Sequence, residues 1–70
     1  MWQATEPFKG GYRTNGLKSN KREYYRWDER HKDVEIYDHN ARYLGSKDPV
    51  TGKAYRKGDM KINFQLKDLK

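Results

Sequence analysis

The stretch EYYRWDERHKDVEIYD, residues 23–38, decides the fold because it contains two strand patterns separated by a short polar turn. The first pattern is rich in aromatic side chains, and the second alternates Val34 and Ile36 with polar residues, as a half-buried β-strand does. We interpret His31-Lys32 as a tight turn between them. The stretch therefore predicts an antiparallel hairpin.

Further segments extend the predicted hairpin into a meander. ARYLGS (41–46) is short and bounded by turn residues, and DPVTGK (48–53) contains the Asp-Pro and the Gly of a turn. AYRK (54–57) predicts a fourth strand, and KINFQL (61–66), whose apolar residues alternate, predicts a fifth. The expected fold is mainly β, with a single small twisted antiparallel sheet of about five strands.

Size and composition limit the core of this sheet. The chain has 70 residues, enough for one domain, and such a domain buries only about 60% of its unfolded surface. The apolar fraction is 33%, so six Tyr, two Trp and two Phe must supply much of the buried area. Residues 1–22 contain three glycines and no sustained apolar period. We expect them to form an irregular basic arm, and residues 23–70 to form the β core of the same domain.

The charge of the chain favours a polyanionic partner over the simpler interpretation of a soluble domain that happens to be basic. Sixteen Lys and Arg against ten Asp and Glu give a formal net charge of +6. Cations interleaved with aromatic side chains are typical of nucleic-acid binding. The side chains expected to contact phosphates are Lys18, Lys21, Arg22, Arg42, Lys53, Arg56 and Lys57. Those expected to divide between base stacking and the core are Tyr24, Tyr25, Tyr43 and Tyr55.

Composition also disfavours several functional classes. The chain has no cysteine, which excludes disulfides and thiolate metal sites. Two histidines without cysteine make a poor zinc site, so we expect neither a metal nor a cofactor. No apolar run approaches the roughly 20 residues of a membrane span, and the first residues lack a secretory hydrophobic region. Membrane insertion by this domain is therefore not expected.

The predicted turn determines which side chains share a face of the hairpin. With His31-Lys32 as the turn, Asp28 lies opposite Glu35, while Trp27 and Ile36 lie on the other face. The polar face then carries Asp28, Glu35, Arg26 and Tyr37, with His31 near its edge. Two facing carboxylates disfavour each other, which raises the pKa of one of them toward the range useful for a general base. The alternative interpretation is an ordinary exposed polar face with a solvated turn histidine. His39, the other histidine, is interpreted as a turn residue.

Several short motifs in residues 23–63 resemble, in order and spacing, the cytotoxic domain of the ribosome-inactivating nuclease colicins and cloacin. The matching positions are Trp27-Asp28, His31, Glu35, Leu44-Gly45-Ser46 and Asp48-Pro49-Val50-Thr51-Gly52. That resemblance implies an antiparallel β ribonuclease that cuts 16S ribosomal RNA at the decoding site. Related domains lie at the C-termini of contact-dependent inhibition toxins and other bacterial competition proteins.

The resemblance also implies catalytic roles for Asp28, His31 and Glu35. The family has an arginine just before an asparagine near its C-terminus, whereas here Ile62 precedes Asn63. The cation that stabilises the phosphate must therefore come from another position. Candidates are Lys61, the nearest in sequence, Arg26, on the predicted polar face, and also Arg42 and Arg56.

A ribonuclease of this kind needs no metal, because the 2′-hydroxyl of RNA attacks the neighbouring phosphorus. We assign Glu35 as the base, with Asp28 close enough to tune it, and His31 as the acid; Asp28 and Glu35 are interchangeable at this stage. The resemblance implies a ribosomal substrate and a cognate immunity protein, which charge predicts to be acidic. It further implies delivery as the C-terminal part of a larger toxin that acts in the target-cell cytoplasm.

Two rival functions stay open on the sequence alone. One is a nonenzymatic RNA-binding β module that uses the same basic and aromatic residues. The other is a toxin nuclease that acts on tRNA or messenger RNA with the same cluster. A metal-dependent DNA nuclease of the HNH type is disfavoured because its metal-binding histidines are missing.

Overall fold

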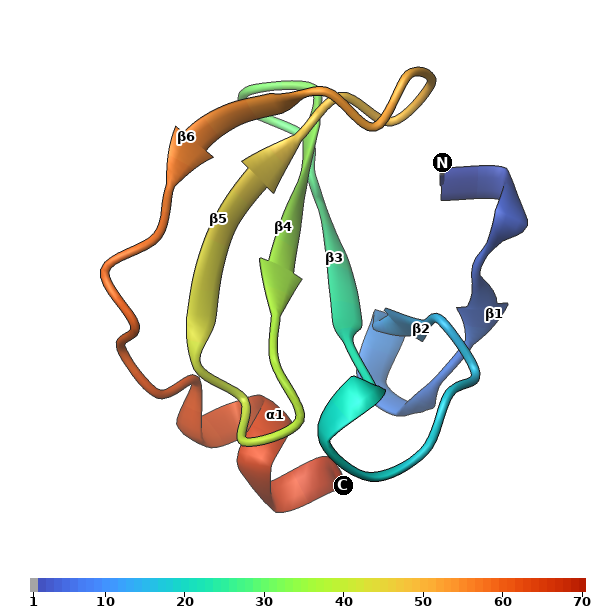
Figure 1. The fold of residues 1–70 in the computed structure, drawn as a ribbon, viewed down its shortest axis with the longest axis vertical. Helices are drawn as coiled ribbons and strands as arrows, with labels where there is room; N and C mark the ends of the chain where they lie inside the picture. Colours follow the sequence, from blue (N-terminus) through green and yellow to red (C-terminus); the bar gives the residue numbers. More distant parts are fainter. Residues whose placement is uncertain (1) are drawn as a thin grey trace.

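Within residues 2–70, six short antiparallel strands form one open sheet in the order β1-β2-β3-β4-β5-β6, so each strand pairs with its neighbour in sequence (Figure 1). The computed structural model describes residues 2–70. The strands are β1 (Glu6–Pro7), β2 (Arg13–Thr14), β3 (Tyr24–Asp28), β4 (Asp33–Tyr37), β5 (Tyr43–Lys47) and β6 (Ala54–Lys57). One short helix, α1 (Phe64–Leu69), follows them. The predicted mainly β fold with a single antiparallel sheet is confirmed.

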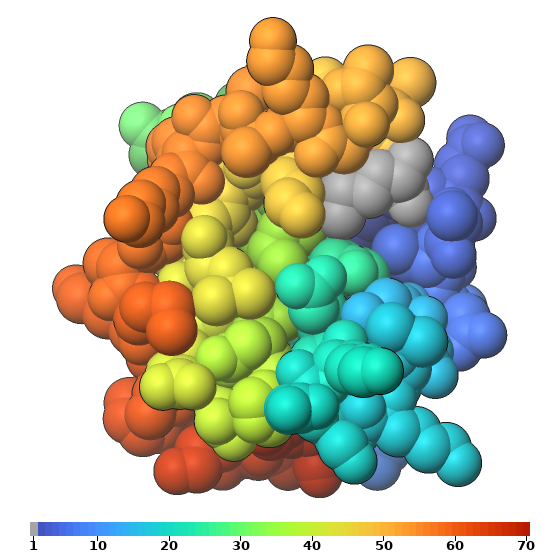
Figure 2. Space-filling model, viewed as in Figure 1, coloured from blue at the N-terminus to red at the C-terminus, as the bar shows by residue number. Residues whose placement is uncertain are grey.

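The N-terminal segment differs from the irregular arm that was expected, because it supplies one edge of the sheet. β1 pairs with β2 and β2 with β3. Three short 3-10 helices lie before, between and after these first two strands: η1 (Trp2–Ala4), η2 (Lys9–Gly11) and η3 (Ser19–Lys21). Strands of two residues have no alternation to detect, which explains why the sequence pattern missed them. In the space-filling view the N-terminal segment (blue) and β6 (orange) lie at opposite margins of the molecule (Figure 2).

The C-terminal segment is a helix where a fifth strand was predicted. In KINFQL, Ile62 forms an isolated bridge with Arg42, and the carbonyl oxygen of Lys61 accepts a hydrogen bond from the backbone N–H of Tyr43 at 2.9 Å. Asn63 then caps α1, since its Oδ1 accepts a hydrogen bond from the backbone N–H of Leu66 at 3.1 Å. Leu66 and Leu69 face the core at helical spacing, whereas Phe64 is 69% exposed. In this segment the helical spacing of Leu66 and Leu69 and the Asn63 cap favour a helix more strongly than the alternation of apolar residues favours a strand. Among residues 2–70 no helix is both long enough and apolar enough to cross a membrane.

The two faces of the sheet carry separate core clusters. Tyr24 and Tyr37 pack with Tyr12 and, from α1, with Leu66. The other face buries Tyr25, Val34 and Ile36, with Trp2, Trp27 and Leu44 packed against them. Of the four tyrosines that were expected to divide between stacking and core, two are buried, whereas Tyr43 is half-buried and Tyr55 is exposed.

The β3–β4 hairpin has the predicted faces but not the predicted register. Asp28 pairs with Asp33 and Arg26 with Glu35, so the predicted pairing of Asp28 with Glu35 is wrong. The turn spans the four residues 29–32 instead of His31-Lys32 alone. A two-residue hairpin turn favours Asn and Gly at positions of positive φ, and neither is present here. Because the register moves by two residues, every side chain keeps its face.

The turn between β5 and β6 is the one that Asp-Pro and Gly predicted. The Asp48 carboxylate accepts hydrogen bonds at 2.8 Å from the backbone N–H groups of Val50 and Thr51. Its other oxygen accepts from the hydroxyl of Tyr55. The Tyr55 hydrogen bond and these two N–H groups lower the pKa of Asp48 to about 2.

This lowered pKa predicts an acid-sensitive turn. A carboxyl whose pKa is lower in the folded than in the unfolded state stabilises the fold above the unfolded pKa of about 4, and the contribution is lost as pH falls from about 4 toward 2. We expect Asp48→Asn to lower the melting temperature at pH 7, and the deficit to shrink toward pH 2. Thermal melts at several pH values measure this difference; parallel pH profiles for the two proteins would contradict it.

Candidate active site

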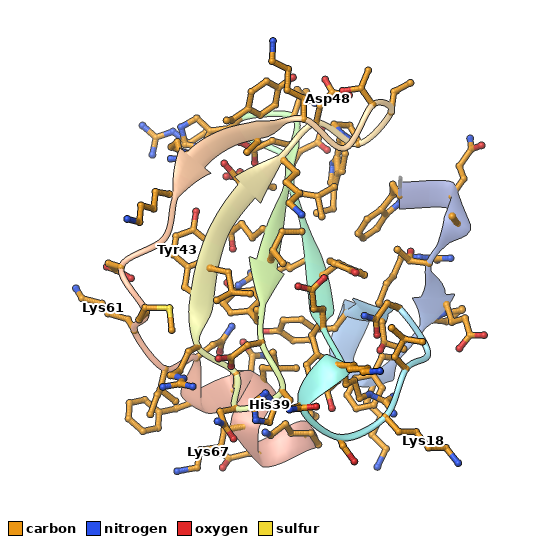
Figure 3. All side chains as sticks on the ribbon, viewed as in Figure 1. Lys18, His39, Tyr43, Asp48, Lys61 and Lys67 are labelled. Atoms are coloured by element: carbon orange, nitrogen blue, oxygen red, sulfur yellow. The ribbon has the colours of Figure 1, made fainter. Side chains whose placement is uncertain are left out.

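An open pocket of about 420 Å³ lies on the polar face of the sheet, closed on one side by the chain between β6 and α1. Tyr43 and Lys61, both labelled in Figure 3, mark the side where β5 faces that segment. The pocket is lined by Asp28, His31, Glu35, Tyr37, Tyr43, Arg56, Asp59, Lys61, Ile62 and Asn63. It therefore brings together all three of the acid–base residues singled out in the sequence.

His31 is oriented by Asp28 within the β3–β4 turn. The Asp28 Oδ1 atom accepts hydrogen bonds from the backbone N–H groups of Arg30 and His31, and its Oδ2 lies 2.8 Å from His31 Nδ1. The ring of His31 together with these N–H groups lowers the pKa of Asp28. An ionised carboxylate only accepts hydrogen bonds, so Nδ1 carries the hydrogen. Nε2 is then the ring nitrogen that remains available to a substrate in the pocket that His31 lines. The pKa increase expected from carboxylate pairing does not occur at Asp28.

Glu35 is held by the tyrosine two residues further along β4. The hydroxyl of Tyr37 donates to Glu35 Oε2 at 2.7 Å. Burial, followed by the neighbouring Glu35, raises the pKa of Tyr37, so this hydroxyl remains a donor at neutral pH. Within residues 2–70 the other carboxylate oxygen, Oε1, accepts no hydrogen bond and can receive one from a substrate.

Arg56 projects from β6 into the same pocket. Its Nε donates to the buried hydroxyl of Ser46 at 3.2 Å, and its Nη2 lies 3.3 Å from Asp33 Oδ2 and 3.8 Å from Asp28 Oδ2. The guanidinium thus lies between the two carboxylates that face each other across the hairpin. Asp33 has a side chain only 4% exposed, and its Oδ1 has no hydrogen-bond partner among the described residues.

Close approach of β6 to β5 positions this arginine. Gly45 has φ +131, and a Cβ there would collide with the main-chain oxygen of Arg56. A Cβ at Gly58 would likewise collide with the backbone of Leu44. The glycine of Leu-Gly-Ser therefore allows β6 to pack closely enough for Arg56 to reach Ser46 and Asp33.

The other candidates for the phosphate-stabilising cation lie less centrally. Lys61 is at the pocket rim, where its side chain is 85% exposed and 3.9 Å from Asp59. Arg26 shares the face of Glu35 by register, but it is exposed and does not line the pocket. Arg42 lies outside the pocket and pairs with Asp38 at 3.0 Å.

The remaining predicted RNA contacts are spread over the surface. Lys18 and Lys21 are exposed in the N-terminal segment, and Figure 3 shows Lys18 at the opposite margin from Lys61. Arg22 is half-buried, with its guanidinium 5.3 Å from the ring centre of Tyr24, so it covers the core. Lys57 is the last residue of β6 and Lys53 directly precedes that strand; both are exposed. His39 lies in the β4–β5 turn, as predicted.

Sequence reasoning did not assign a role in the site to several residues that shape it. Tyr37 was placed on the correct face, but its bond to Glu35 was not foreseen. Asp33 and Ser46 hold Arg56 through contacts that depend on strand pairing. Asn63 belongs to a segment that was predicted as a strand, and Asp59 lies between the predicted strands 54–57 and 61–66. In residues 2–70 no group of three or more His, Asp or Glu side chains is arranged to hold a metal ion.

Fold and pocket together define a small β domain with an imidazole, carboxylates and a guanidinium gathered on one face of its sheet. The family model Cytotoxic matches residues 3–65, so the chain belongs to the Cytotoxic family and is a cytotoxic toxin domain. Neither the curated proteins nor the solved structures give a significant match. The predicted toxin class is confirmed, whereas the ribosome-inactivating subtype stays a prediction.

Proposed function

We propose that this toxin domain is a metal-independent endoribonuclease that cleaves 16S ribosomal RNA at the decoding site and thereby blocks translation. The observation that carries the proposal is the single pocket shared by His31, Glu35 and Arg56, with Asp28 behind the imidazole. These groups match what RNA cleavage requires: a base, an acid and a cation for the phosphorane. The sequence resemblance to ribosome-inactivating colicin domains supports the choice of 16S ribosomal RNA.

Each side chain has a defined part in the reaction. Glu35 Oε1 takes the proton from the 2′-hydroxyl as its oxygen attacks the phosphorus. His31 Nε2 gives a proton to the departing 5′-oxygen, while Asp28 fixes the ring through Nδ1. Arg56 donates to the crowded phosphorane oxygens. The products are a 2′,3′-cyclic phosphate and a 5′-hydroxyl, which balances the protons taken and given.

The partners follow from the same proposal. A small domain recognises the shape and the splayed bases of the decoding site more readily than a long sequence. The producing cell needs protection, and a net charge of +6 favours an acidic immunity protein. We further propose that the domain is delivered as the C-terminal part of a larger toxin and acts in the target-cell cytoplasm.

Mapping the cleaved end tests this function. Ribosomes incubated with the purified domain should yield one new 3′ end, within the decoding site of 16S ribosomal RNA, carrying a cyclic phosphate. A synthetic decoding-site RNA should be cut equally well with and without EDTA. Cleavage confined to tRNA or messenger RNA would refute the ribosomal target, and a strict need for magnesium would refute the mechanism.

A further inference from the structure

A second, basic groove adjoins the catalytic pocket. Its volume is about 320 Å³, and its lining residues are Asn40, Arg42, Ile62, Lys67 and Lys70. Ile62 lines both the groove and the catalytic pocket, so the two are neighbours separated by one apolar side chain. Figure 3 shows Lys67 and Lys61 toward one margin of the molecule and Lys18 toward the other.

The fold of the C-terminal segment creates this groove. The bridge between Arg42 and Ile62 holds the segment beside the start of β5, and the backbone N–H of Asn63 donates to the carbonyl oxygen of Ala41 at 2.8 Å. Helix α1 then begins, and its Lys67 and its C-cap residue Lys70 line the same groove as Arg42.

The charge of the groove is strongly positive. Among the described residues three cations line it and no acidic side chain does. Arg42 uses its Nε to pair with Asp38, which offsets one charge, and Lys70 Nζ donates to the carbonyl oxygen of His39. Lys67 forms no ion pair within the part of the chain that the structure describes. The groove is therefore suited to an anion that the protein itself does not supply.

We propose that the basic groove is a second phosphate subsite, which binds a phosphodiester flanking the scissile linkage of the RNA strand in the catalytic pocket. The inference rests on the proposed ribonuclease function for the identity of that strand. A continuous strand that enters the pocket beside Ile62 meets Arg42 and Lys67 next, and its repeating phosphates provide the anion. Salt-sensitive contacts of this kind add affinity without reading sequence.

Binding of uncleavable RNAs of two lengths tests the subsite. A 2′-O-methylated hexanucleotide reaches both sites, whereas a 2′-O-methylated dinucleotide carries a single linkage. We expect the variant Lys67→Ala/Lys70→Ala to bind the hexanucleotide about tenfold more weakly at low salt, with a salt slope smaller by about 1.4. Its affinity for the dinucleotide should change less than about twofold. NMR titration of the labelled full chain measures both affinities. The backbone amide resonances around Arg42 and Lys67 should shift with the hexanucleotide but not with the dinucleotide.

The matched control removes the same two charges elsewhere. Lys9 and Lys47 line neither the pocket nor the groove, so Lys9→Ala/Lys47→Ala should weaken both RNAs equally and by less than about threefold. Lys67→Ala alone disrupts no ion pair and should retain part of the effect if the double variant unfolds. The subsite would be overturned if the two double variants lost equal affinity for the hexanucleotide. It would also be overturned if Lys67→Ala/Lys70→Ala left hexanucleotide binding unchanged, in which case the groove would serve only an acidic protein. Groove-dependent binding by a protein that cuts no RNA would instead overturn the ribonuclease function alone.

Discussion

Replacing His31 with alanine should slow RNA cleavage by about 10²–10⁴-fold, the usual contribution of a positioned general acid. The side chain is 49% exposed and, within residues 2–70, hydrogen-bonds only to Asp28, so its loss should leave the fold largely intact. Glu35→Gln should have an effect of similar size, because the amide keeps the shape and the acceptor for Tyr37 but cannot take a proton. Single-turnover cleavage of synthetic decoding-site RNA measures both effects, and thermal melting checks the fold.

The neighbouring residue in the same turn provides the control for this experiment. Lys32 is 65% exposed and pairs with Glu29 outside the pocket, so Lys32→Ala should stay within about threefold of the wild-type rate. The combined His31→Ala/Glu35→Gln variant should be little slower than the slower single variant, because an acid and a base of one reaction act as a unit. Toxicity that survives the double substitution would favour a nonenzymatic RNA-binding module.

The hairpin shows how far the sequence alone could predict this fold. Alternation of Val34 and Ile36 with polar residues was sufficient to identify β4 and its two faces. It also placed Asp28 and Glu35 on the same face of the hairpin. The register depended on loop length, which alternation does not encode. The register is determined by the Asp28 side chain, which accepts hydrogen bonds from two backbone N–H groups of the turn, and by Lys32, whose φ is +56.

The two ends of the chain were harder for a different physical reason. Two-residue strands such as β1 are stabilised by their pairing with β2 and not by a pattern of their own. At the C-terminus the sequence did contain a usable signal, since Asn63 stands three residues before Leu66 and six before Leu69. That capping pattern competes with a strand-like alternation over the same residues, and only packing against the tyrosine cluster settles the competition.

The site was predictable where its residues are close in sequence and unpredictable where they are distant. Asp28, His31 and Glu35 lie on one hairpin, so a local pattern finds them. Arg56 reaches the same pocket only because β6 pairs with β5, and its anchors lie ten and 23 residues away in the chain. No spacing in the sequence distinguished it from the other exposed arginines.

Arg56 gives the second large prediction, because it is the best-placed cation of the pocket. Arg56→Ala should lower cleavage at saturating RNA by about 10²–10³-fold, as expected when a donor to a developing oxyanion is removed. It should also destabilise the fold by about 1–2 kcal/mol, since the nearly buried Asp33 loses its counterion while the arginine itself is half exposed. Arg56→Lys keeps the charge but cannot reach Ser46 and Asp33 together, so its cleavage rate should fall between those of the wild type and Arg56→Ala.

A variant of the adjacent Lys57 distinguishes a catalytic role of Arg56 from general electrostatic attraction of RNA. Lys57 carries the same charge on the same strand but does not line the pocket, so Lys57→Ala should raise KM for RNA and leave kcat nearly unchanged. Arg56→Ala should do the reverse and act chiefly on kcat. If both substitutions changed only KM, Arg56 would be an ordinary phosphate contact. The stabilising cation would then have to be Lys61, whose exposed side chain must swing in from the rim only once RNA is bound.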